Sequence, residues 1–420
     1  MFIVRSDSEG RNLRNLNIGH GNREKSLDLY LPYPFSRDEY RERLDRVRAE
    51  MARKKIDVLF LSSPESLFYI SGYASEWYQA QSPNAHEWLP ASGIAVEVDH
   101  EDFIFFDTGE EEGLIRDTTV TNDARYLLSP EEEASRMLEW IAEELEKEGW
   151  LPGIVGLEMW SYRPNRAVSE MFQKELEKKG GRVVDATDIV RYARWIKSPQ
   201  EIAYIEKAAR IADIGMNAAI ESMRPGMTEL EVYGEIVYAM AKAGGEATAI
   251  PVLVHTGDKG GGHALASRRK IKKGDIVGID LCGVFNRYHA NIMRSFSIST
   301  PRPYVARTAD KVAEAFEVVG EVIKPNLPVA ELNERMRAYY KDAEIDRTWC
   351  GGYELGIGFP PDWVGWFVYD TVIDPGDRKF VPGTVVNHES LGQPSVINTI
   401  IFGKEQARML SQIPNELIII

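Results

Sequence analysis

The sequence predicts two domains, an α/β domain followed by an α+β domain. With 420 residues, the chain is long enough to build two separate hydrophobic cores. Helical and strand patterns alternate along roughly the first half of the chain, which is typical of an α/β layered domain. Between residues 250 and 300 the apolar pattern changes to period two with glycine and lysine turns, which indicates neighbouring strands.

The first domain is expected over residues 36–190, after an irregular N-terminal arm over residues 1–35. Ser36 is a suitable cap for a helix whose apolar residues recur on one face. Apolar, β-prone runs bounded by turn residues then indicate strands. The expected strands are Ile56–Leu61, Ser92–Val98, Asp102–Asp107 and Ile154–Leu157, and an amphipathic helix is expected from Pro130 to Lys147.

The second domain is expected over residues 191–420. Ser198 with Glu201 three residues later has the pattern of a capping box, and Thr228 with Glu231 repeats it. Both pairs therefore predict the start of a helix. Strands are expected at 250–255, 275–282 and 292–298, helices at 306–323 and 328–343, and strands again within 349–420.

The composition narrows the class of protein. Hydrophobic residues make up 44% and charged residues 27%, which is ordinary for a soluble globular chain. A net charge of −15 argues against binding to nucleic acid or to an anionic membrane, because both need a basic face. There is no signal-peptide pattern and no apolar run of ~18 residues, and only Cys282 and Cys350 are available as thiols. We therefore expect a cytoplasmic protein in which both cysteines are small apolar fillers.

Motifs in the second half of the chain point to a known family. They are Gly278–Gly283, Arg287–Arg294, Gly352–Gly358 and Asn387–Ser390. These stretches resemble motifs of the pita-bread enzymes, which include methionine aminopeptidase, prolidase, creatinase and ectoine hydrolase. The stretch Gly352–Trp363, GYELGIGFPPDW, is most similar to the ectoine hydrolase branch. The resemblance implies a creatinase-like α/β N-terminal domain followed by a C-terminal pita-bread catalytic domain.

The same resemblance implies a metal site that has lost most of its ligands. Metallopeptidases of the family hold two metal ions with two Asp, one His and two Glu. The matching positions here are Asp280, Asn291, Tyr353, Glu389 and Ile397. Isoleucine offers no ligand atom, and a tyrosine with a reference pKa of about 10 is a poor ligand at neutral pH. We therefore expect neither a metal nor another cofactor, and only the neighbouring His289 and His388 offer replacement ligands.

Two carboxylates remain as the expected catalytic acids. Asp280 and Glu389 are costly to bury without a partner, so we expect them to bind a cationic amidinium or guanidinium group through charge-assisted hydrogen bonds. The alternative is that they are relics, neutral or paired with Arg294. His263 follows a glycine-rich loop, and the resemblance to creatinase-like enzymes implies that it is the general acid and base. His255 is the second candidate for this role.

The remaining candidates are expected to bind substrate. In the second domain they are His255, His289, Asn291, Tyr353, Trp363 and His388, and in the first domain Trp77, Tyr78, His86 and Trp88. In creatinase-type dimers the equivalent N-domain loop reaches the partner's active site, so the resemblance implies a homodimer. The other interpretation of this loop is ordinary packing at a domain interface.

The sequence thus predicts a metal-independent hydrolase of a non-peptide C–N bond in a small cationic or zwitterionic compound. An ectoine-like amidine is the first choice and a creatine-like guanidino compound the second, since Met293, Val364 and Ile397 replace residues of the creatinase pocket. Three alternatives stay open. They are a lyase of a small sulfonium or betaine-like compound, a metal-dependent Xaa-Pro peptidase and a non-catalytic binding protein.

Overall fold

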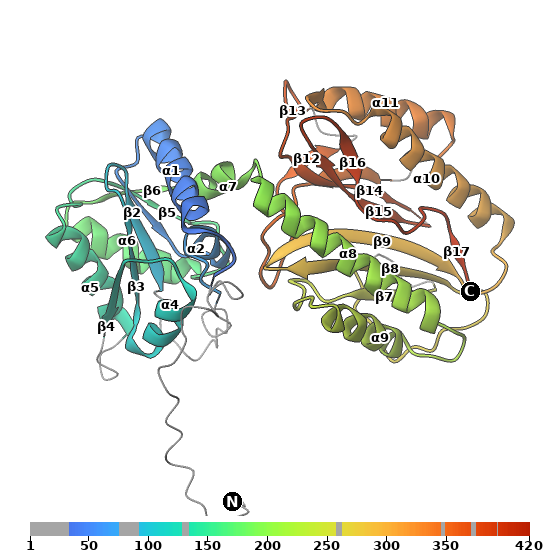
Figure 1. Ribbon diagram of the computed structural model, residues 1–420, viewed down its shortest axis with the longest axis horizontal. Coiled ribbons are helices and arrows are strands. Elements are labelled where there is room, and N and C mark those ends of the chain that lie inside the picture. The colour runs from blue at the N-terminus through green and yellow to red at the C-terminus, as the bar shows by residue number, and fades with distance from the viewer. Residues whose placement is uncertain are drawn as a thin grey trace, which may run out of the picture.

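The computed structural model describes residues 33–74, 92–127, 134–257, 263–345, 349–370, 375–392 and 394–420. They form two domains, joined where α7 leads into the long helix α8 (Figure 1). The N-domain loop candidates Trp77, Tyr78, His86 and Trp88 and most of the expected arm lie outside the described residues. No helix within the described ranges is long and apolar enough to cross a membrane.

The N-terminal domain is built on a six-stranded sheet in the order β4-β3-β2-β1-β5-β6. Its elements are α1 (Arg37–Lys54), β1 (Val58–Leu61), α2 (Pro64–Ser71), β2 (Gly93–Glu97), β3 (Phe103–Thr108), η1 (Gly109–Glu111), α4 (Glu112–Thr118), β4 (Asp123–Leu127), α5 (Ala134–Lys147), β5 (Ile154–Leu157), α6 (Arg166–Lys178), β6 (Arg182–Asp185) and α7 (Asp188–Arg194). Leu59 and Leu61 pack in the core with α1, α2 and α7, whereas Val58 and Phe60 pack with α5 and α6. Because helices cover both faces, the central strand is an unbroken apolar run rather than an alternating one.

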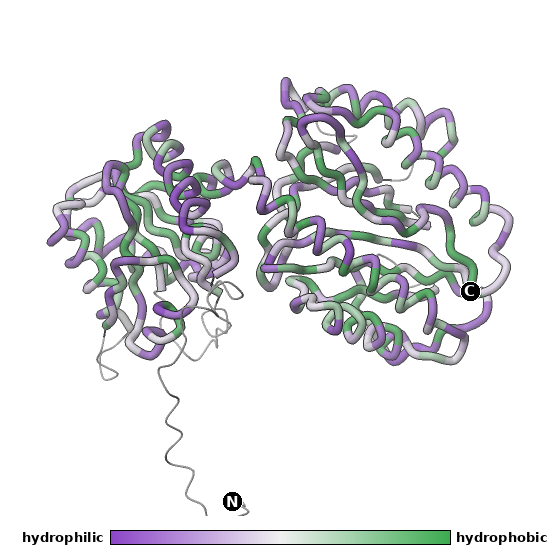
Figure 2. Tube along the Cα trace, viewed as in Figure 1, coloured by the Kyte–Doolittle hydropathy of each residue, from purple (hydrophilic) through white to green (hydrophobic). Residues whose placement is uncertain are grey.

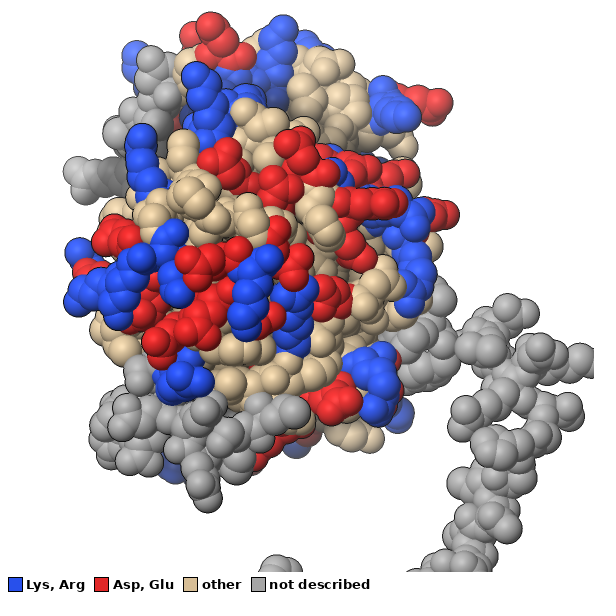
Figure 3. All heavy atoms as spheres, turned by 90° about the vertical axis from the view of Figure 1, so that its left-hand side faces the viewer, with Lys and Arg blue, Asp and Glu red and all other residues tan. Residues whose placement is uncertain are grey.

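The predicted start of helix α1 and the four predicted strands of this domain are confirmed. The Ser36 side chain accepts a hydrogen bond from the backbone N–H of Glu39 at 3.2 Å, so it caps α1 as expected. The four predicted strands are present as β1, β2, β3 and β5, with ends that differ by two residues or fewer. On the face in Figure 3, acidic and basic side chains are interspersed. Arg125, for example, pairs with Asp123, Glu144 and Glu148.

The C-terminal domain is built on a sheet whose main path, β12-β11-β14-β15-β9-β8-β7, is antiparallel throughout. Its elements are α8 (Pro199–Ser222), α9 (Glu229–Lys242), β7 (Leu253–Thr256), β8 (Ile276–Phe285), β9 (Tyr288–Ser297), α10 (Pro303–Val322), β10 (Leu327–Pro328), α11 (Val329–Asp342), β11 (Trp349–Tyr353), β12 (Phe367–Asp370), β13 (Lys379–Phe380), β14 (Val385–Leu391), β15 (Val396–Phe402), β16 (Ala407–Met409) and β17 (Ile418–Ile419). Both predicted capping boxes, at Ser198 and Thr228, are formed.

Helices cover only one face of this sheet. The pair α8 and α9 packs on β7, β8 and β9 through residues such as Ile279 and Leu281. The pair α10 and α11 packs on β11, β12, β14 and β15 through residues such as Val386 and Ile400. Figure 2 shows that hydrophobic residues concentrate along the strands of both domains, while the helices carry hydrophilic residues as well. The second face of the C-terminal sheet therefore holds the strand residues that alternate with these apolar ones.

A buried cation connects the two domains. The guanidinium of Arg43 in α1 donates to the Glu39 carboxylate at 3.1 Å and to the hydroxyl of Tyr288 in β9 at 3.2 Å. The Tyr288 hydroxyl donates in turn to Glu201 in α8 at 2.8 Å. Phe35 lies under the same guanidinium, with 3.8 Å between the guanidinium carbon and the ring centre. A buried charge paired in this way fixes the relative position of the domains, because removing one partner leaves the other uncompensated.

Candidate active site

Two carboxylates project from the same face of the C-terminal sheet. In the strand register, Asp280 of β8 lies opposite Met293 of β9, Met293 opposite Ile397 of β15, and Ile397 opposite Glu389 of β14. Residues directly opposite each other on antiparallel strands share a face. We call this line the acid row. It places the two expected acids at its ends and two apolar side chains between them.

A second line of polar residues runs beside the acid row, two residues along each strand. The backbone N–H of Asn291 in β9 donates to the hydroxyl of Thr399 in β15 at 2.9 Å, and that hydroxyl donates to the backbone carbonyl of Asn291 at 2.9 Å. Thr399 lies opposite Asn387 of β14, and the side-chain oxygen of Asn387 accepts from the backbone N–H of Tyr353 at 2.8 Å. We call this line the amide row. Sequence reasoning missed Asn387 and Thr399, although Asn387 shares a strand face with Glu389 by period two.

The amide row connects the two acids. Asn291 donates from Nδ2 to Asp280 Oδ1 at 2.7 Å, and Asn387 donates from Nδ2 to Glu389 Oε1 at 2.7 Å. Asn387 Nδ2 also donates to Asn291 Oδ1 at 3.2 Å, which closes the chain.

The orientation of both amides follows from their backbone partners. The carbonyl of Leu281 can only accept, so it must face Asn291 Nδ2, 3.1 Å away. The backbone N–H of Tyr353 can only donate, so it must face Asn387 Oδ1. The amide hydrogens therefore point at the carboxylates, and the side-chain oxygen of each amide accepts one hydrogen bond.

Burial makes both acids reluctant to ionise. It raises the pKa of Glu389 to about 8, helped by the nearby charge of Asp280 and opposed by hydrogen bonds from Asn387 and Tyr353. Burial also raises the pKa of Asp280 to about 6, opposed by the hydrogen bond from Asn291 and by the charge of His263. Between these two pH values the pair holds one proton and one negative charge. Carboxylates of this kind are typical of functional sites.

Tyr353 is oriented by an indole. The Nε1–H of Trp363 donates to the Tyr353 hydroxyl at 3.2 Å. Because an indole N–H can only donate, the phenol accepts from it and directs its own hydrogen to Glu389, with which it is hydrogen bonded. Both side chains are buried. The two expected substrate-binding residues therefore lie at the Glu389 end of the acid row.

The two candidate general bases lie at the opposite end, near Asp280. His263 is exposed, and its charge lowers the pKa of Asp280, so the two groups are neighbours. His255 of β7 lies opposite Gly278, two residues before Asp280 and on the same face. Its ring covers Gly278 so closely that a Cβ there would meet ring atoms at 2.3 Å. The glycine is therefore required for the histidine to lie flat against β8.

A buried carboxylate anchors the segment that carries His263. Glu229, the first residue of α9, accepts hydrogen bonds from the backbone N–H and hydroxyl of Thr256 at 3.0 and 2.6 Å. It also accepts from the N–H and hydroxyl of Ser267 at 2.9 and 2.6 Å. These residues flank His263 on either side, so Glu229 holds both ends of its segment. Sequence reasoning missed Glu229, because no local pattern links it to a loop almost 30 residues away.

The expectations for His388, Arg294 and His289 need correction. His388 does not lie with the acids, because period two turns it to the opposite face from its neighbour Glu389. There its Nδ1 bonds the hydroxyl of Tyr369 at 2.6 Å, and burial lowers its pKa to about 3. Arg294 does not pair with the acids either. Its guanidinium donates instead to four backbone carbonyls, those of Met293, Ile397, Ile413 and Pro414.

His289 is on the site face but has no nitrogen left for a ligand. Its Nδ1 bonds the carbonyl of Arg287 at 2.9 Å and its Nε2 accepts from the backbone N–H of Ala249 at 3.2 Å. The first bond needs a proton on Nδ1 and the second needs a free lone pair on Nε2, so the ring is held neutral. Burial accordingly lowers its pKa to about 3. His289 contributes an apolar wall near Trp363, with 6.1 Å between ring centres.

These donors do not fit a two-metal centre. Such a centre needs several anionic ligands around two closely spaced ions. The acid row supplies only Asp280 and Glu389, with Met293 and Ile397 between them. Asn291 already uses its side-chain oxygen to accept from Asn387. Among the described residues, no group of three or more His, Cys, Asp or Glu side chains is placed to hold a metal ion.

Comparisons with known proteins agree with this architecture. Residues 43–196 match the Creatinase/Prolidase N-terminal domain, and residues 203–404 match Metallopeptidase family M24. The ectoine hydrolase of Halomonas elongata is 27% identical over 416 residues, covering 93% of this chain and all of that protein. The Xaa-Pro dipeptidase of Pyrococcus furiosus is 26% identical over 387 residues, covering 90% of this chain and all of that protein.

Solved structures show the same fold. The crystal structure of a prolidase from Pyrococcus horikoshii superposes with a TM-score of 0.72 at 22% sequence identity, covering 90% of this chain and 100% of that one. The predicted fold class, a creatinase-like N-terminal domain followed by a pita-bread domain, is therefore confirmed. The M24 match and the two relatives together support a hydrolase.

Proposed function

Because this chain belongs to the pita-bread family of creatinase, ectoine hydrolase and prolidase, we propose that it hydrolyses a non-peptide C–N bond in a small cationic or zwitterionic amidino compound. An ectoine-like cyclic amidine is the first candidate substrate and a creatine-like guanidino compound the second. We propose further that no resident metal takes part. The observation that carries the proposal is the chain of two acids and two amides from Asp280 to Glu389.

The proposed substrate class follows from the need of Asp280 and Glu389 for a cationic partner. Each acid receives an amide N–H on one oxygen, yet burial still raises the pKa values of both. The missing partner is a positive charge with further N–H donors. An amidinium supplies both in one planar group, and charge-assisted hydrogen bonds to carboxylates are among the strongest in proteins. Binding such a cation would offset the desolvation cost of Asp280 and Glu389.

The chemistry assigned to the site is addition of water to the amidine carbon. His263 takes a proton from the attacking water as the C–O bond forms. The same imidazole then returns that proton to the departing nitrogen as the C–N bond breaks. The hydroxyl hydrogen of the intermediate is lost as the C=O bond forms and ends on the departing nitrogen, which leaves a neutral amide and an ammonium group. Asp280 and Glu389 hold the cationic nitrogen group through both steps. An imidazole can both accept and donate a proton, which suits both proton transfers.

A metal-dependent Xaa-Pro peptidase is the second candidate, favoured by the similarity to the Xaa-Pro dipeptidase of Pyrococcus furiosus. It requires a metal centre, for which the acid and amide rows offer two carboxylates and amide oxygens that each accept one hydrogen bond. The donor set therefore supports the amidine hydrolase over the peptidase.

The test is turnover of a small panel by protein treated with a chelator and dialysed. The panel holds ectoine, creatine, a sulfonium betaine and an Xaa-Pro dipeptide. We expect a new free amino group to form as the ring of ectoine or a related cyclic amidine opens, at a rate that the chelator does not change. Glu389→Gln should abolish this activity, whereas Glu405→Gln, at an exposed site, should not. Activity on the dipeptide that disappears with the chelator and returns with stoichiometric manganese, cobalt or zinc would overturn the proposal. Cleavage of the sulfonium compound without uptake of water would identify a lyase instead.

A further inference from the structure

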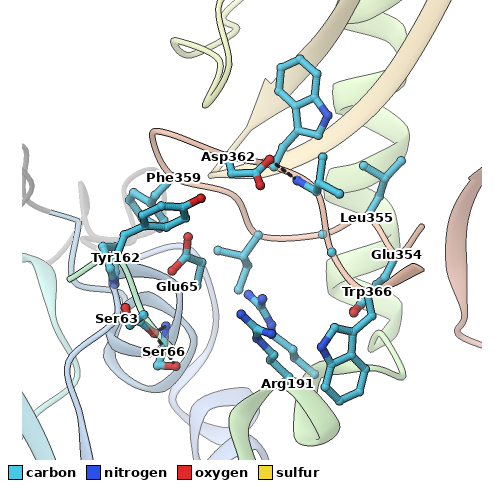
Figure 4. Close-up of a pocket in the computed structure, with 18 of the residues that line it drawn as sticks. Ser63, Glu65, Ser66, Tyr162, Arg191, Glu354, Leu355, Phe359, Asp362 and Trp366 are labelled. Atoms are coloured by element: carbon cyan, nitrogen blue, oxygen red, sulfur yellow. Dashed lines mark hydrogen bonds between the residues drawn. The ribbon is translucent and has the colours of Figure 1, made fainter. Parts of the chain in front are cut away.

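A cavity lies at the junction of the two domains. It has a volume of about 140 Å³, close to that of an engineered protein cavity that holds benzene. Its lining comes from the start of α2, the connection between β5 and α6, helix α7 and the segment 354–366. Neither Asp280 nor Glu389 lines it. Figure 4 shows Arg191 of α7 reaching toward the middle of this cavity, below Glu65 and beside Trp366.

The cavity contains guanidinium donors that have no acceptor among the described residues. Arg191 and Arg194, one helical turn apart on α7, both line it. The Nε and Nη1 atoms of Arg194 are buried and have no hydrogen-bond partner within the part of the chain that the structure describes. Guanidinium donors buried without acceptors are costly, and a ligand that supplies acceptors removes that cost.

Most carboxylates that line the cavity accept hydrogen bonds from, or form ion pairs with, groups other than Arg191 and Arg194. Glu158 accepts from the N–H groups of Ser62 and Ser63, Glu201 accepts from Ser198 and Tyr288, Glu354 pairs with Lys197, and Asp362 accepts from the N–H of Val364. Glu65 remains as the acid that both arginines influence, since their charges lower its pKa while burial raises it. Four other acids line the cavity besides Glu65, so the lining carries no excess of positive charge. The Nε and Nη1 donors of Arg194 nevertheless have no acceptor among the described residues, and the anionic group of a ligand can supply one.

The walls of the cavity favour an apolar body on that ligand. Phe359, Trp366 and Tyr162 line the cavity together with Arg191 (Figure 4). Trp366 is held edge-on against Tyr192 of α7, with 4.8 Å between ring centres. Phe359 packs across the domain junction against Phe68 of α2 at 5.8 Å. Aromatic faces beside a pair of guanidinium groups suit a flat ring that carries an acid.

We propose that this domain-junction cavity is a binding site for a small monocarboxylate with an aromatic or apolar body. The carboxylate accepts hydrogen bonds from Arg191 and Arg194, and the ring packs against Trp366 and Phe359. Planar bidentate contact between guanidinium and carboxylate gives such a site its selectivity for an acid. Trp363 lines the same cavity and donates to Tyr353 beside Glu389, so the occupant also contacts the wall of the acid site.

Calorimetric titration with benzoate tests the site. Benzylamine, which has the same ring and the opposite charge, is the matched probe. We expect benzoate to bind one site per chain and benzylamine to show no binding there. Arg194→Gln and Arg191→Gln should each weaken benzoate binding at least tenfold. Arg224→Gln, which removes an exposed arginine elsewhere, should leave it unchanged. Glu389→Gln should also leave it unchanged, which separates this cavity from the acid site.

A second measurement guards against variants that fail to fold. Benzoate bound beside Trp366 should alter tryptophan fluorescence of the unmodified protein, and Trp366→Phe should remove that change. The proposal is overturned by equal binding of benzoate and benzylamine, by folded Arg194→Gln and Arg191→Gln variants that bind as tightly as the parent, or by an absence of benzoate binding at millimolar concentration. A further outcome would also overturn it. If the arginine variants bind benzoate as well as the parent does but sediment as monomers where the parent is a dimer, the guanidinium groups serve a subunit contact.

Discussion

Replacing Glu389 by glutamine should stabilise the ligand-free protein, and more so as the pH rises. The side chain is buried, with an exposed fraction of 6%, and its pKa of about 8 lies above the ordinary value of 4.5. The folded protein therefore holds a proton that the unfolded chain has already lost in this pH range. Stability must fall between pH 4.5 and 8 and level off above it, because deprotonation is more favourable in the unfolded state.

The size of the effect follows from the two pKa values. Each pH unit within this window costs the parent protein about 1.4 kcal/mol, so the whole window amounts to at most about 5 kcal/mol. Glutamine keeps an oxygen for the hydrogen bond from Asn387 but has no proton to lose. The stability advantage of Glu389→Gln should therefore grow by up to about 4 kcal/mol between pH 5 and pH 9. For a domain of this size each kcal/mol shifts Tm by roughly 2–4 °C.

Differential scanning calorimetry of the parent, Glu389→Gln and Glu405→Gln at a series of pH values measures this directly. The difference in Tm between the parent and Glu389→Gln should widen steadily as the pH rises to 8 and then stay constant. The exposed Glu405 serves as the control and should show no such trend. The argument would be refuted if the Tm difference between the parent and Glu389→Gln were the same at pH 5 and pH 9. In that case the Glu389 carboxyl would have the same pKa in the folded and in the unfolded protein.

The remaining predictions concern ligand and proton. Binding of a cationic amidine to the acid pair should make the protein release a proton between pH 6 and 8, because the cation lowers the raised pKa values of Asp280 and Glu389. Calorimetric titration in buffers of different ionisation heat measures this release. Equal binding heats in all buffers would contradict the prediction. His263→Gln should lower kcat on a confirmed substrate by at least about 100-fold with little change in KM; unchanged turnover would remove His263 from the mechanism. His388→Phe should keep the activity of the parent, since His388 packs between Tyr369 and Phe316 on the covered face; a large loss of kcat with an intact fold would be contrary to this placement.

Local patterns predicted much of the fold because they report local physics. Ser198 and Thr228 were identified as helix starts from spacing alone, and both form complete capping boxes. The helix α2 was not predicted, although its signal is present. Ser63 caps it and Pro64 opens it, but a Ser-Pro pair also ends a strand, and the preceding strand made that interpretation the stronger one.

The site itself was only partly accessible from sequence. Period two along β14 already implies that Glu389 and His388 face opposite sides, so the misplacement of His388 was avoidable. The alignment of Asp280 and Met293 with Ile397 and Glu389 was not, because it depends on the register between β9 and β15, which lie about 100 residues apart in the chain. Register between distant strands is set by packing of the whole sheet rather than by any one segment.

The amide row explains how a site of this ancestry remains foldable with two buried acids. With an aspartate at position 291, three carboxyl groups would crowd the face and require cations to stabilise them. Asn291 instead donates to Asp280 and accepts from Asn387, which donates to Glu389. Each acid therefore gains an N–H partner without any ion, although burial still raises its pKa. In this arrangement the side chain at position 291 contributes an N–H donor to the site rather than a third carboxyl group.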